Sequence, residues 1–147
     1  MESRLKEVGN RNKVPFALMV RDEKILVGCR NYTKDIWKDI SVWTIPGGRC
    51  EEGETIENAL RREVKEEVNI TEFEIIDFVG EVPAMTEGDS IIVFFCMTKQ
   101  DAKLMEPEKF SEWQWISKSE YIANEKYGGF NPMTRKIIFE YIRKINL

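Results

Sequence analysis

The strongest constraint on the fold of this chain comes from residues 56–68, IENALRREVKEEV, which contain neither glycine nor proline. They are rich in good helix formers, and Thr55 directly before them is a residue type that commonly caps a helix. At about 100° per residue, one side of this helix carries four apolar residues, Ile56, Ala59, Leu60 and Val64. Glu63, Glu66 and Glu67 fall within the same arc. The face that should pack against the core therefore becomes acidic halfway along the helix.

This acidic face needs a source of positive charge. Like charges three and four residues apart repel one another, so Glu63, Glu66 and Glu67 destabilise an isolated helix. Hard divalent cations such as Mg²⁺ are commonly held by a few carboxylates together with substrate phosphates, and such a cation would offset the repulsion. The alternative is a solvated face whose glutamates pair with basic side chains of the same helix. The helix alone leaves both interpretations open, and the residues around it must decide.

The chain contains no histidine, and this narrows the chemistry available to it. Ser-His-Asp and Cys-His nucleophile systems, histidine zinc sites and imidazole bases are all excluded. The three cysteines, Cys29, Cys50 and Cys96, lie far apart without a C-x-x-C pair, which fits free thiols in a reducing compartment. Any catalysis must therefore rely on carboxylates, lysines, cysteines or a bound cation.

Length and charge indicate a small soluble domain. The chain has 147 residues, with 22 basic and 26 acidic side chains and a net charge of −4. No basic patch stands out, so duplex nucleic acid and anionic lipid are disfavoured as partners. Residues 1–13 lack an apolar signal core, and the longest apolar run, 91–97, is too short to span a membrane. We expect a cytoplasmic protein without a membrane partner, and the sequence leaves homodimer formation open.

The hydrophobic pattern alternates between strands and helices. Apolar runs at 14–20 and 25–30 flank a short charged connection and predict a β-hairpin. Further strands are expected at 42–48, 72–82, 91–100 and 111–117, with loops at 31–41, 49–54 and 83–90 and a weakly helical segment at 118–125. Asn131 and Pro132 begin a last helix with an apolar stripe. Strands interleaved with two good helices predict an α/β fold.

The residues around the acidic helix resemble the signature of the Nudix hydrolases. That signature is matched in order by Gly48, Glu54, Arg62, Glu63, Val64, Glu66, Glu67, Asn69 and Ile70. Asn69 is the one departure, since the family has glycine there. It follows the helix, where the backbone is expected to be left-handed, and asparagine tolerates this conformation. The resemblance implies one Nudix domain over 1–147, with its box at 48–70 and an α/β/α sandwich that holds a mixed sheet between helices.

The resemblance also implies a metal site and its ligands. Glu66 and Glu67 are expected to bind the metal. Glu63 is a third carboxylate that either binds the metal or deprotonates the attacking water. The backbone carbonyl of Gly47 is expected to complete the site, because glycine allows close approach to an ion.

Other residues of the box are expected to hold the site together. Arg62 belongs with the catalytic glutamates in the signature, and its expected part is to pair with Glu54 across the junction of loop and helix. Gly48 and Gly53 are expected to form turns in the loop.

A ligand from outside the box is expected to close the metal site. In MutT-type relatives a glutamate on a later loop has this part, and the segment 106–117 resembles that branch, which acts on nucleoside triphosphates. The candidates are Glu87, Asp89, Glu106, Glu108 and Glu112. We favour Glu108, because a loop just before the strand at 111–117 can fold over a bound triphosphate.

The resulting functional hypothesis is metal-dependent hydrolysis of a phosphoanhydride bond. With Mg²⁺ or Mn²⁺ as cofactor, a nucleoside triphosphate would be cleaved to a monophosphate and pyrophosphate. Other Nudix substrates stay open, namely ADP-ribose, nucleotide sugars and dinucleoside polyphosphates. So do two alternatives of other classes, a non-catalytic nucleotide-binding domain and a structural or Ca²⁺-binding module. Trp113, Tyr127 and Phe130 are candidates for stacking on a base, although aromatic residues of a small domain are more often core.

Overall fold

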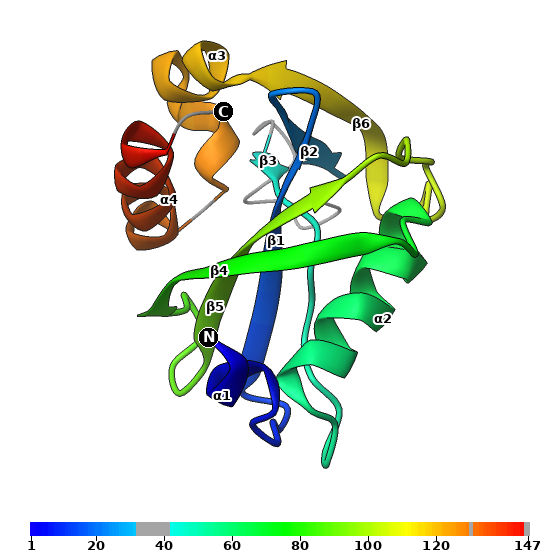
Figure 1. Ribbon diagram of the computed structural model, residues 1–147, viewed down its shortest axis with the longest axis vertical. Helices are drawn as coiled ribbons and strands as arrows, with labels where there is room; N and C mark the ends of the chain where they lie inside the picture. Colours follow the sequence, from blue (N-terminus) through cyan, green and yellow to red (C-terminus); the bar gives the residue numbers. More distant parts are fainter. Residues whose placement is uncertain (32–41, 130, 146–147) are drawn as a thin grey trace.

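The computed structural model of the chain describes residues 1–31, 42–129 and 131–145. Its elements, shown in Figure 1, are α1 (Glu2–Leu5), β1 (Lys13–Arg21), β2 (Lys24–Arg30), β3 (Val42–Thr44), α2 (Ile56–Val68), β4 (Phe73–Pro83), β5 (Ser90–Thr98), β6 (Phe110–Ser117), α3 (Lys118–Ala123), the 3₁₀ turn η1 (Glu125–Gly128) and α4 (Pro132–Lys144). The predicted strands and helices are confirmed with small shifts at their ends, except that the strand expected over 42–48 ends at Thr44. The sequence pattern did not predict α1, and residues 32–41 of the predicted loop lie outside the described residues.

Within the described ranges the strands form a six-stranded mixed sheet in the order β3-β2-β1-β5-β4, with β6 paired to β2. β1 and β2 are the predicted antiparallel hairpin. β1 and β5 run parallel at the centre, with Phe16 opposite Val93. The other pairs are antiparallel. The centre of the sheet thus joins segments far apart in the sequence.

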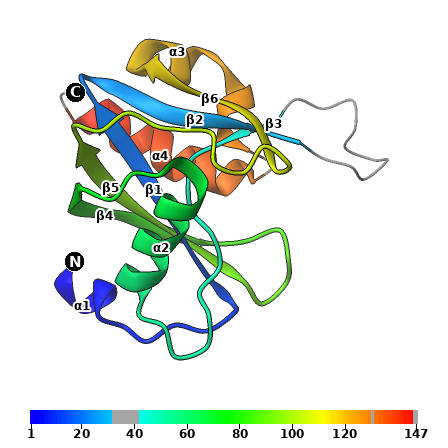
Figure 2. The ribbon, with the colours of Figure 1, turned by 90° about the vertical axis from the view of Figure 1, so that its right-hand side faces the viewer.

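Helices cover both faces of the sheet, and this confirms the predicted α/β/α sandwich. Because side chains alternate along a strand, Ala17 and Met19 of β1 pack with the apolar side of α2, whereas Leu18 and Val20 pack with α3 and α4. Figure 2 views the sheet from the α2 side, with α4 behind it. The apolar stripe predicted for the last helix belongs to this second core. No helix in the described part of the chain has both the length and the apolar character needed to cross a membrane.

The ends of α2 are formed as the sequence predicts. The Thr55 side chain accepts a hydrogen bond from the backbone N–H of Asn58 at 3.2 Å and caps the first turn. Asn69 follows the last turn in the left-handed conformation, with φ 57° and ψ 30°. The substitution of asparagine for the family's glycine is therefore compatible with the helix end. These two ends determine where α2 begins and ends relative to the loop that carries the rest of the box.

Candidate active site

The box loop and α2 meet where Gly47 contacts Glu67. The backbone N–H of Gly47 donates a hydrogen bond to Oε1 of Glu67 at 2.7 Å. Gly47 also lies against β1, and a Cβ added to it would lie 2.4 Å from the carbonyl oxygen of Pro15. Glycine is required here because the loop must approach strand and helix together. Two of the predicted metal ligands are thereby brought together.

Glu67 is a buried carboxylate, with 4% of the residue exposed. Burial raises the pKa of its carboxyl to about 8, because the charged form is separated from water. The hydrogen bond from Gly47 opposes this change, and the negative charges of Glu63 and Glu106 add to it. In this position the carboxyl of Glu67 is charged at neutral pH only if a nearby cation offsets the effect of burial.

Arg62 links the loop to the helix, as predicted. Its Nε and Nη2 donate to the two carboxylate oxygens of Glu54 at 2.8 and 2.9 Å. Nη2 also donates to the carbonyl of Arg49 at 3.1 Å, and Nη1 donates to Glu63 at 3.0 Å. These hydrogen bonds lower the pKa of Glu54 and raise that of Arg62. Arg62 therefore connects the scaffold to one of the catalytic candidates.

The three glutamates differ in how far they are buried. Burial raises the pKa of the Glu63 carboxyl, although Arg62 opposes this change. Glu66 is much more exposed and lies 3.4 Å from Nη1 of Arg62. Within 1–31, 42–129 and 131–145, no three acidic, histidine or cysteine side chains are grouped so that they could hold a metal ion. Arg62 lies between two of the three glutamates, because its Nη1 contacts both Glu63 and Glu66.

The residues present still fit a hard divalent cation. Glu63, Glu66 and Glu67 supply the carboxylate oxygens that such cations prefer, next to the backbone of Gly47. Burial and mutual repulsion raise the pKa of Glu67, and a nearby cation would offset both effects. The donor chemistry and the electrostatics therefore agree with the predicted cofactor.

The two remaining box glycines serve different purposes. Gly53 has φ +80° and forms the predicted turn. A Cβ on Gly48 would lie 2.4 Å from the carboxyl carbon of Glu63. Gly48 is therefore needed for the close approach of Glu63, which the prediction of a simple turn did not include.

The five candidates for the outside ligand lie in different environments. Glu108 is exposed in the turn before β6, and Glu87 and Glu112 are exposed as well. Glu106 is partly buried, pairs with Lys109 at 3.2 Å and raises the pKa of Glu67 through its charge. Asp89 is buried and forms an ion pair elsewhere in the site. Of the five, Glu106 is the one whose negative charge contributes to the raised pKa of Glu67.

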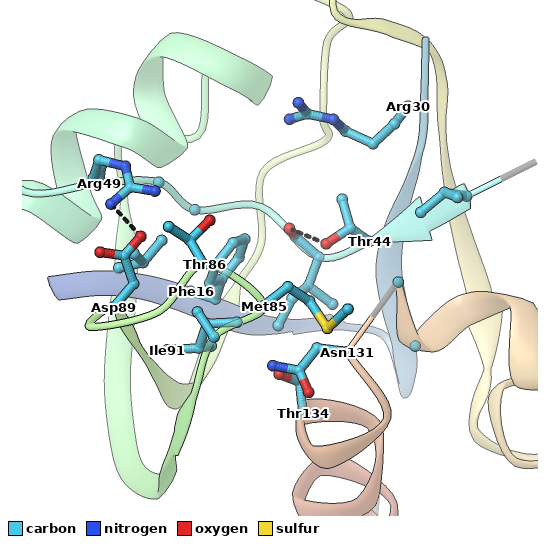
Figure 3. A pocket seen from close by; sticks show the side chains of 18 of the residues that line it. Phe16, Arg30, Thr44, Arg49, Met85, Thr86, Asp89, Ile91, Asn131 and Thr134 are labelled. Carbon is cyan, nitrogen blue, oxygen red and sulfur yellow. Dashed lines mark hydrogen bonds and ion pairs between the residues drawn. The ribbon is translucent and has the colours of Figure 1, made fainter. Parts of the chain in front are cut away.

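A cavity of about 390 Å³ opens beside the box. Its wall includes Arg30, Gly47, Arg49, Glu67, Asp89 and Thr134. Figure 3 shows these surroundings, with Arg49 and Asp89 paired at one end and Asn131 and Thr134 at another. The sequence did not predict this combination, because its residues come from separate segments of the chain and share no periodicity.

Arg49 joins the box loop to the loop between β4 and β5. Its Nη1 lies 2.7 Å from Oδ2 of Asp89 and donates to the carbonyl of Arg11 at 2.6 Å. A guanidinium carries five N–H donors, so Arg49 keeps donors for another anion in the cavity. Arg30 lies over the ring of Phe110, 5.1 Å from its centroid. Two arginines and Glu67 thus share one cavity.

Two of the aromatic side chains considered for base stacking, Trp113 and Tyr127, do not line this cavity. Tyr127 is 3% exposed, packs edge-on against Trp43 and donates its hydroxyl to Glu120. Trp113 packs on Phe110 and lies so close to Gly28 that a Cβ there would be 2.6 Å from its ring. Tyr127 is a core residue and Trp113 is partly buried against the core, which agrees with the alternative interpretation. Phe130 lies outside the described residues.

The N-terminal segment supports the box loop, and the sequence offered no signal for this. Val8 pairs with Thr55 in an isolated antiparallel bridge. The N–H of Gly9 donates to the carbonyl of Glu54 at 2.7 Å, and the N–H of Ile56 donates to the carbonyl of Glu7 at 2.9 Å. A single bridge has no periodicity that a sequence could reveal. Residues 7–9 therefore hold Glu54, the partner of Arg62, from outside the box.

We predict that Gly9→Ala loosens this support. The new Cβ would lie 2.8 Å from Sγ of Cys50 and 3.2 Å from Cδ1 of Ile56, so the segment has to move away from the loop. Overpacking of this kind costs about 1–3 kcal/mol. We expect a lower Tm together with a lower kcat, because Glu54 loses part of its anchoring. Thermal unfolding and steady-state kinetics measure the two effects.

The matched control combines Gly9→Ala with Cys50→Ala, which removes the sulfur that the new methyl group meets. If the clash is the cause, the double variant recovers part of the Tm and kcat, relative to Cys50→Ala alone. If Gly9→Ala lowers Tm and kcat by the same amount in the Cys50→Ala background, the clash with the sulfur is not the cause, and the proposed support of the loop by residues 7–9 is contradicted.

Comparison with known proteins identifies relatives over most of the chain. The family model described as "NUDIX domain" matches residues 11–137. Nucleoside triphosphatase NudI of Escherichia coli strain K12 is 28% identical over 109 residues, covering 65% of this chain and 73% of NudI. Nudix hydrolase 5 of Arabidopsis thaliana is 34% identical over 97 residues, covering 62% of this chain and 31% of that protein.

The fold has solved counterparts. The MutT protein from Methanosarcina mazei Go1 superposes with a TM-score of 0.70 at 21% identity, covering 92% of this chain and 95% of that one. At this identity the likeness concerns the fold.

Proposed function

Because this chain belongs to the NUDIX domain family, we propose that it hydrolyses a nucleoside triphosphate to the monophosphate and pyrophosphate. It is a Nudix pyrophosphohydrolase by family, and such enzymes generally use a divalent metal. Mg²⁺ or Mn²⁺ is our proposal for that metal. The similarity to NudI, which is named a nucleoside triphosphatase, supports this substrate class. Three further expectations stay predictions: that residues 1–147 form one domain, that the protein is cytoplasmic, and that duplex nucleic acid is not a partner. Homodimer formation stays open.

One observation carries the proposal: a single cavity is lined by Glu67 and Gly47 of the box and by two arginines. Guanidinium groups bind phosphate oxygens through several N–H donors, whereas a carboxylate alone would repel them. A cavity with both kinds of group suits a polyphosphate that binds together with a cation. Its remaining wall is mostly uncharged and has room for the nucleoside.

Each protein group then has a defined task. Arg30 and Arg49 hold the phosphate chain. Glu63, whose pKa burial raises, accepts the proton of the attacking water at a carboxylate oxygen. Arg62 keeps Glu63 beside Gly48, which lines the cavity. A bound divalent cation would supply charge neutralisation of the phosphates and of Glu67.

We propose Glu106, in place of Glu108, as the ligand from outside the box. Two observations support this choice: the negative charge of Glu106 raises the pKa of Glu67, and Glu106 is partly buried. Glu106→Gln is expected to raise the Mg²⁺ concentration needed for half-maximal turnover by roughly tenfold. Loss of one group around a metal site typically lowers metal affinity by about this factor. A Mg²⁺ titration of initial rates measures this.

Glu108→Gln and Glu87→Gln serve as controls in the same titration. Both side chains are exposed, and we expect both variants to behave like the wild type. A larger effect of Glu108→Gln than of Glu106→Gln would return the assignment to Glu108, and a dominant effect of Glu87→Gln would move it to the earlier loop.

A substrate screen tests the proposed function directly. The purified chain is incubated with Mg²⁺ and with nucleoside triphosphates, ADP-ribose, nucleotide sugars or dinucleoside polyphosphates, and the products are separated by chromatography. We expect a monophosphate and pyrophosphate from at least one triphosphate. Preference for another class would change the substrate, and binding without any turnover would favour the non-catalytic alternative.

A further inference from the structure

Thr134, in the first turn of α4, carries a buried hydroxyl that lacks a partner. The residue is 9% exposed and lines the cavity beside the box. Its Oγ1 has no hydrogen-bond partner within the described part of the chain. Buried hydroxyl groups are nearly always hydrogen-bonded, because an unpaired one costs free energy. A hydroxyl left unpaired at the wall of a substrate cavity indicates a partner that arrives with the ligand.

The neighbouring Asn131 lines the same wall, but both polar atoms of its side chain already have partners in the fold. Its Nδ2 donates to the carbonyl of Pro83 at 2.8 Å, and its Oδ1 accepts from the N–H of Met133 at 3.0 Å. These bonds tie the start of α4 to the end of β4 and cap the helix. The amide is thus used by the fold, whereas the hydroxyl of Thr134 is left for the ligand.

The surroundings of Thr134 indicate what kind of group would reach it. Figure 3 shows Met85 beside Asn131 and Thr134, with Phe16 and Ile91 nearby, while Arg30 and the pair of Arg49 and Asp89 lie farther off. Met85 is 68% exposed, and its unbranched side chain can adjust to a ligand. This end of the cavity is largely apolar and uncharged. It suits a flat, neutral, weakly polar ring better than a phosphate or a sugar with several hydroxyls.

We propose that Thr134 is a specificity-determining residue whose hydroxyl hydrogen-bonds the nucleobase of the substrate. This proposal rests on the proposed function and adds to it the place where the base binds. A hydroxyl can donate and accept, so it can pair with a ring carbonyl, a ring nitrogen or an exocyclic amine. Thr134 therefore selects for the presence of a base more than for its identity.

The test compares Thr134→Val, which removes the hydroxyl and keeps the shape, with Thr134→Ser, which keeps the hydroxyl. With a nucleoside triphosphate we expect Thr134→Val to raise KM by roughly 3- to 10-fold, the loss of one neutral hydrogen bond, while kcat changes little. Thr134→Ser should stay within about twofold of the wild type. Inorganic tripolyphosphate has no base, so its inhibition constant against the same substrate should be equal in all three proteins.

The ligand-free proteins supply a second measurement. Replacing an unpaired hydroxyl by a methyl group should leave Tm unchanged or raise it. Thr98→Val is the matched control, because Thr98 is equally buried but donates to the carbonyl of Glu72 at 2.7 Å and lies outside the cavity wall. This control should lower Tm and leave KM unchanged.

An unchanged KM in Thr134→Val overturns the proposal, and so does a fall in its Tm as large as that of Thr98→Val. A rise in KM accompanied by an equal rise in the tripolyphosphate constant also overturns it, since the effect would then not concern the base. If the wild type hydrolyses no triphosphate, the proposed function fails by itself. Calorimetric Kd values for a nucleoside triphosphate with Mg²⁺, compared between wild type and Thr134→Val, then decide the role of Thr134.

Discussion

Replacing Glu67 with glutamine is expected to lower turnover by roughly 10²- to 10⁴-fold, the range found for loss of a positioned catalytic group. Glutamine keeps an oxygen that can accept the hydrogen bond from the N–H of Gly47, so the contact between loop and helix should survive. What it removes is the buried negative charge that we propose binds the metal. Initial rates at limiting and saturating Mg²⁺ measure the loss, and turnover near wild type at limiting Mg²⁺ would refute the assignment.

The same substitution should stabilise the metal-free protein near neutral pH. Burial raises the pKa of Glu67 from an ordinary 4.5 to about 8, so the folded state binds a proton more tightly than the unfolded state. The stabilisation from this proton is complete below about pH 4.5 and is lost as pH rises through about 8. With EDTA present, we expect Tm of the wild type to fall across this range more steeply than that of Glu67→Gln.

A control on the same helix separates this effect from a general loss of charge. Glu57 lies in the first turn and forms a partly exposed ion pair with Arg61. Glu57→Gln should change neither turnover nor the slope of Tm against pH. If Tm falls with pH equally steeply in wild type and in Glu67→Gln, the buried carboxylate of Glu67 does not destabilise the metal-free protein.

Replacing Arg62 with alanine is expected to lower both stability and activity. The side chain makes two hydrogen bonds to Glu54 and one to Glu63, and only 26% of it is exposed. Its removal leaves two partly buried carboxylates without their cation, at a cost of about 2 kcal/mol. That corresponds to a fall in Tm of roughly 4–8 °C for a chain of this size. We expect kcat to fall as well, because Glu63 loses its contact and the loop loses its link to the helix.

Arg61→Ala is the matched control for Arg62→Ala. Arg61 is the next residue on α2, and its ion pair with Glu57 is more exposed, at 38% and 36% of the side chains. Exposed pairs contribute about 1 kcal/mol or less, so its removal should have the smaller effect on Tm and leave kcat near wild type. If Arg62→Ala lowers kcat while Tm stays unchanged, Arg62 acts directly in the chemistry, and its scaffolding part is secondary.

The sequence by itself predicted the parts of the protein that depend on neighbouring residues. The bounds of α2 follow from Thr55 and Asn69, whose side chain and backbone conformation act on the first and last turns of the same helix. The pairing of Arg62 with Glu54 was expected from the resemblance to the Nudix box, and the structure contains it. The α/β class follows from strand and helix periodicities in order along the chain.

Tertiary structure alone decided the features that join distant segments. The parallel pairing of β1 with β5, the support of Glu54 by Gly9 and the cavity that includes Glu67 and Thr134 all depend on how separate elements pack. Glu66 and Glu67 are equivalent in the signature, yet packing buries Glu67 and leaves Glu66 half exposed. Periodicity and caps act over a few residues, whereas burial depends on the whole core, so only the folded chain distinguishes such neighbours.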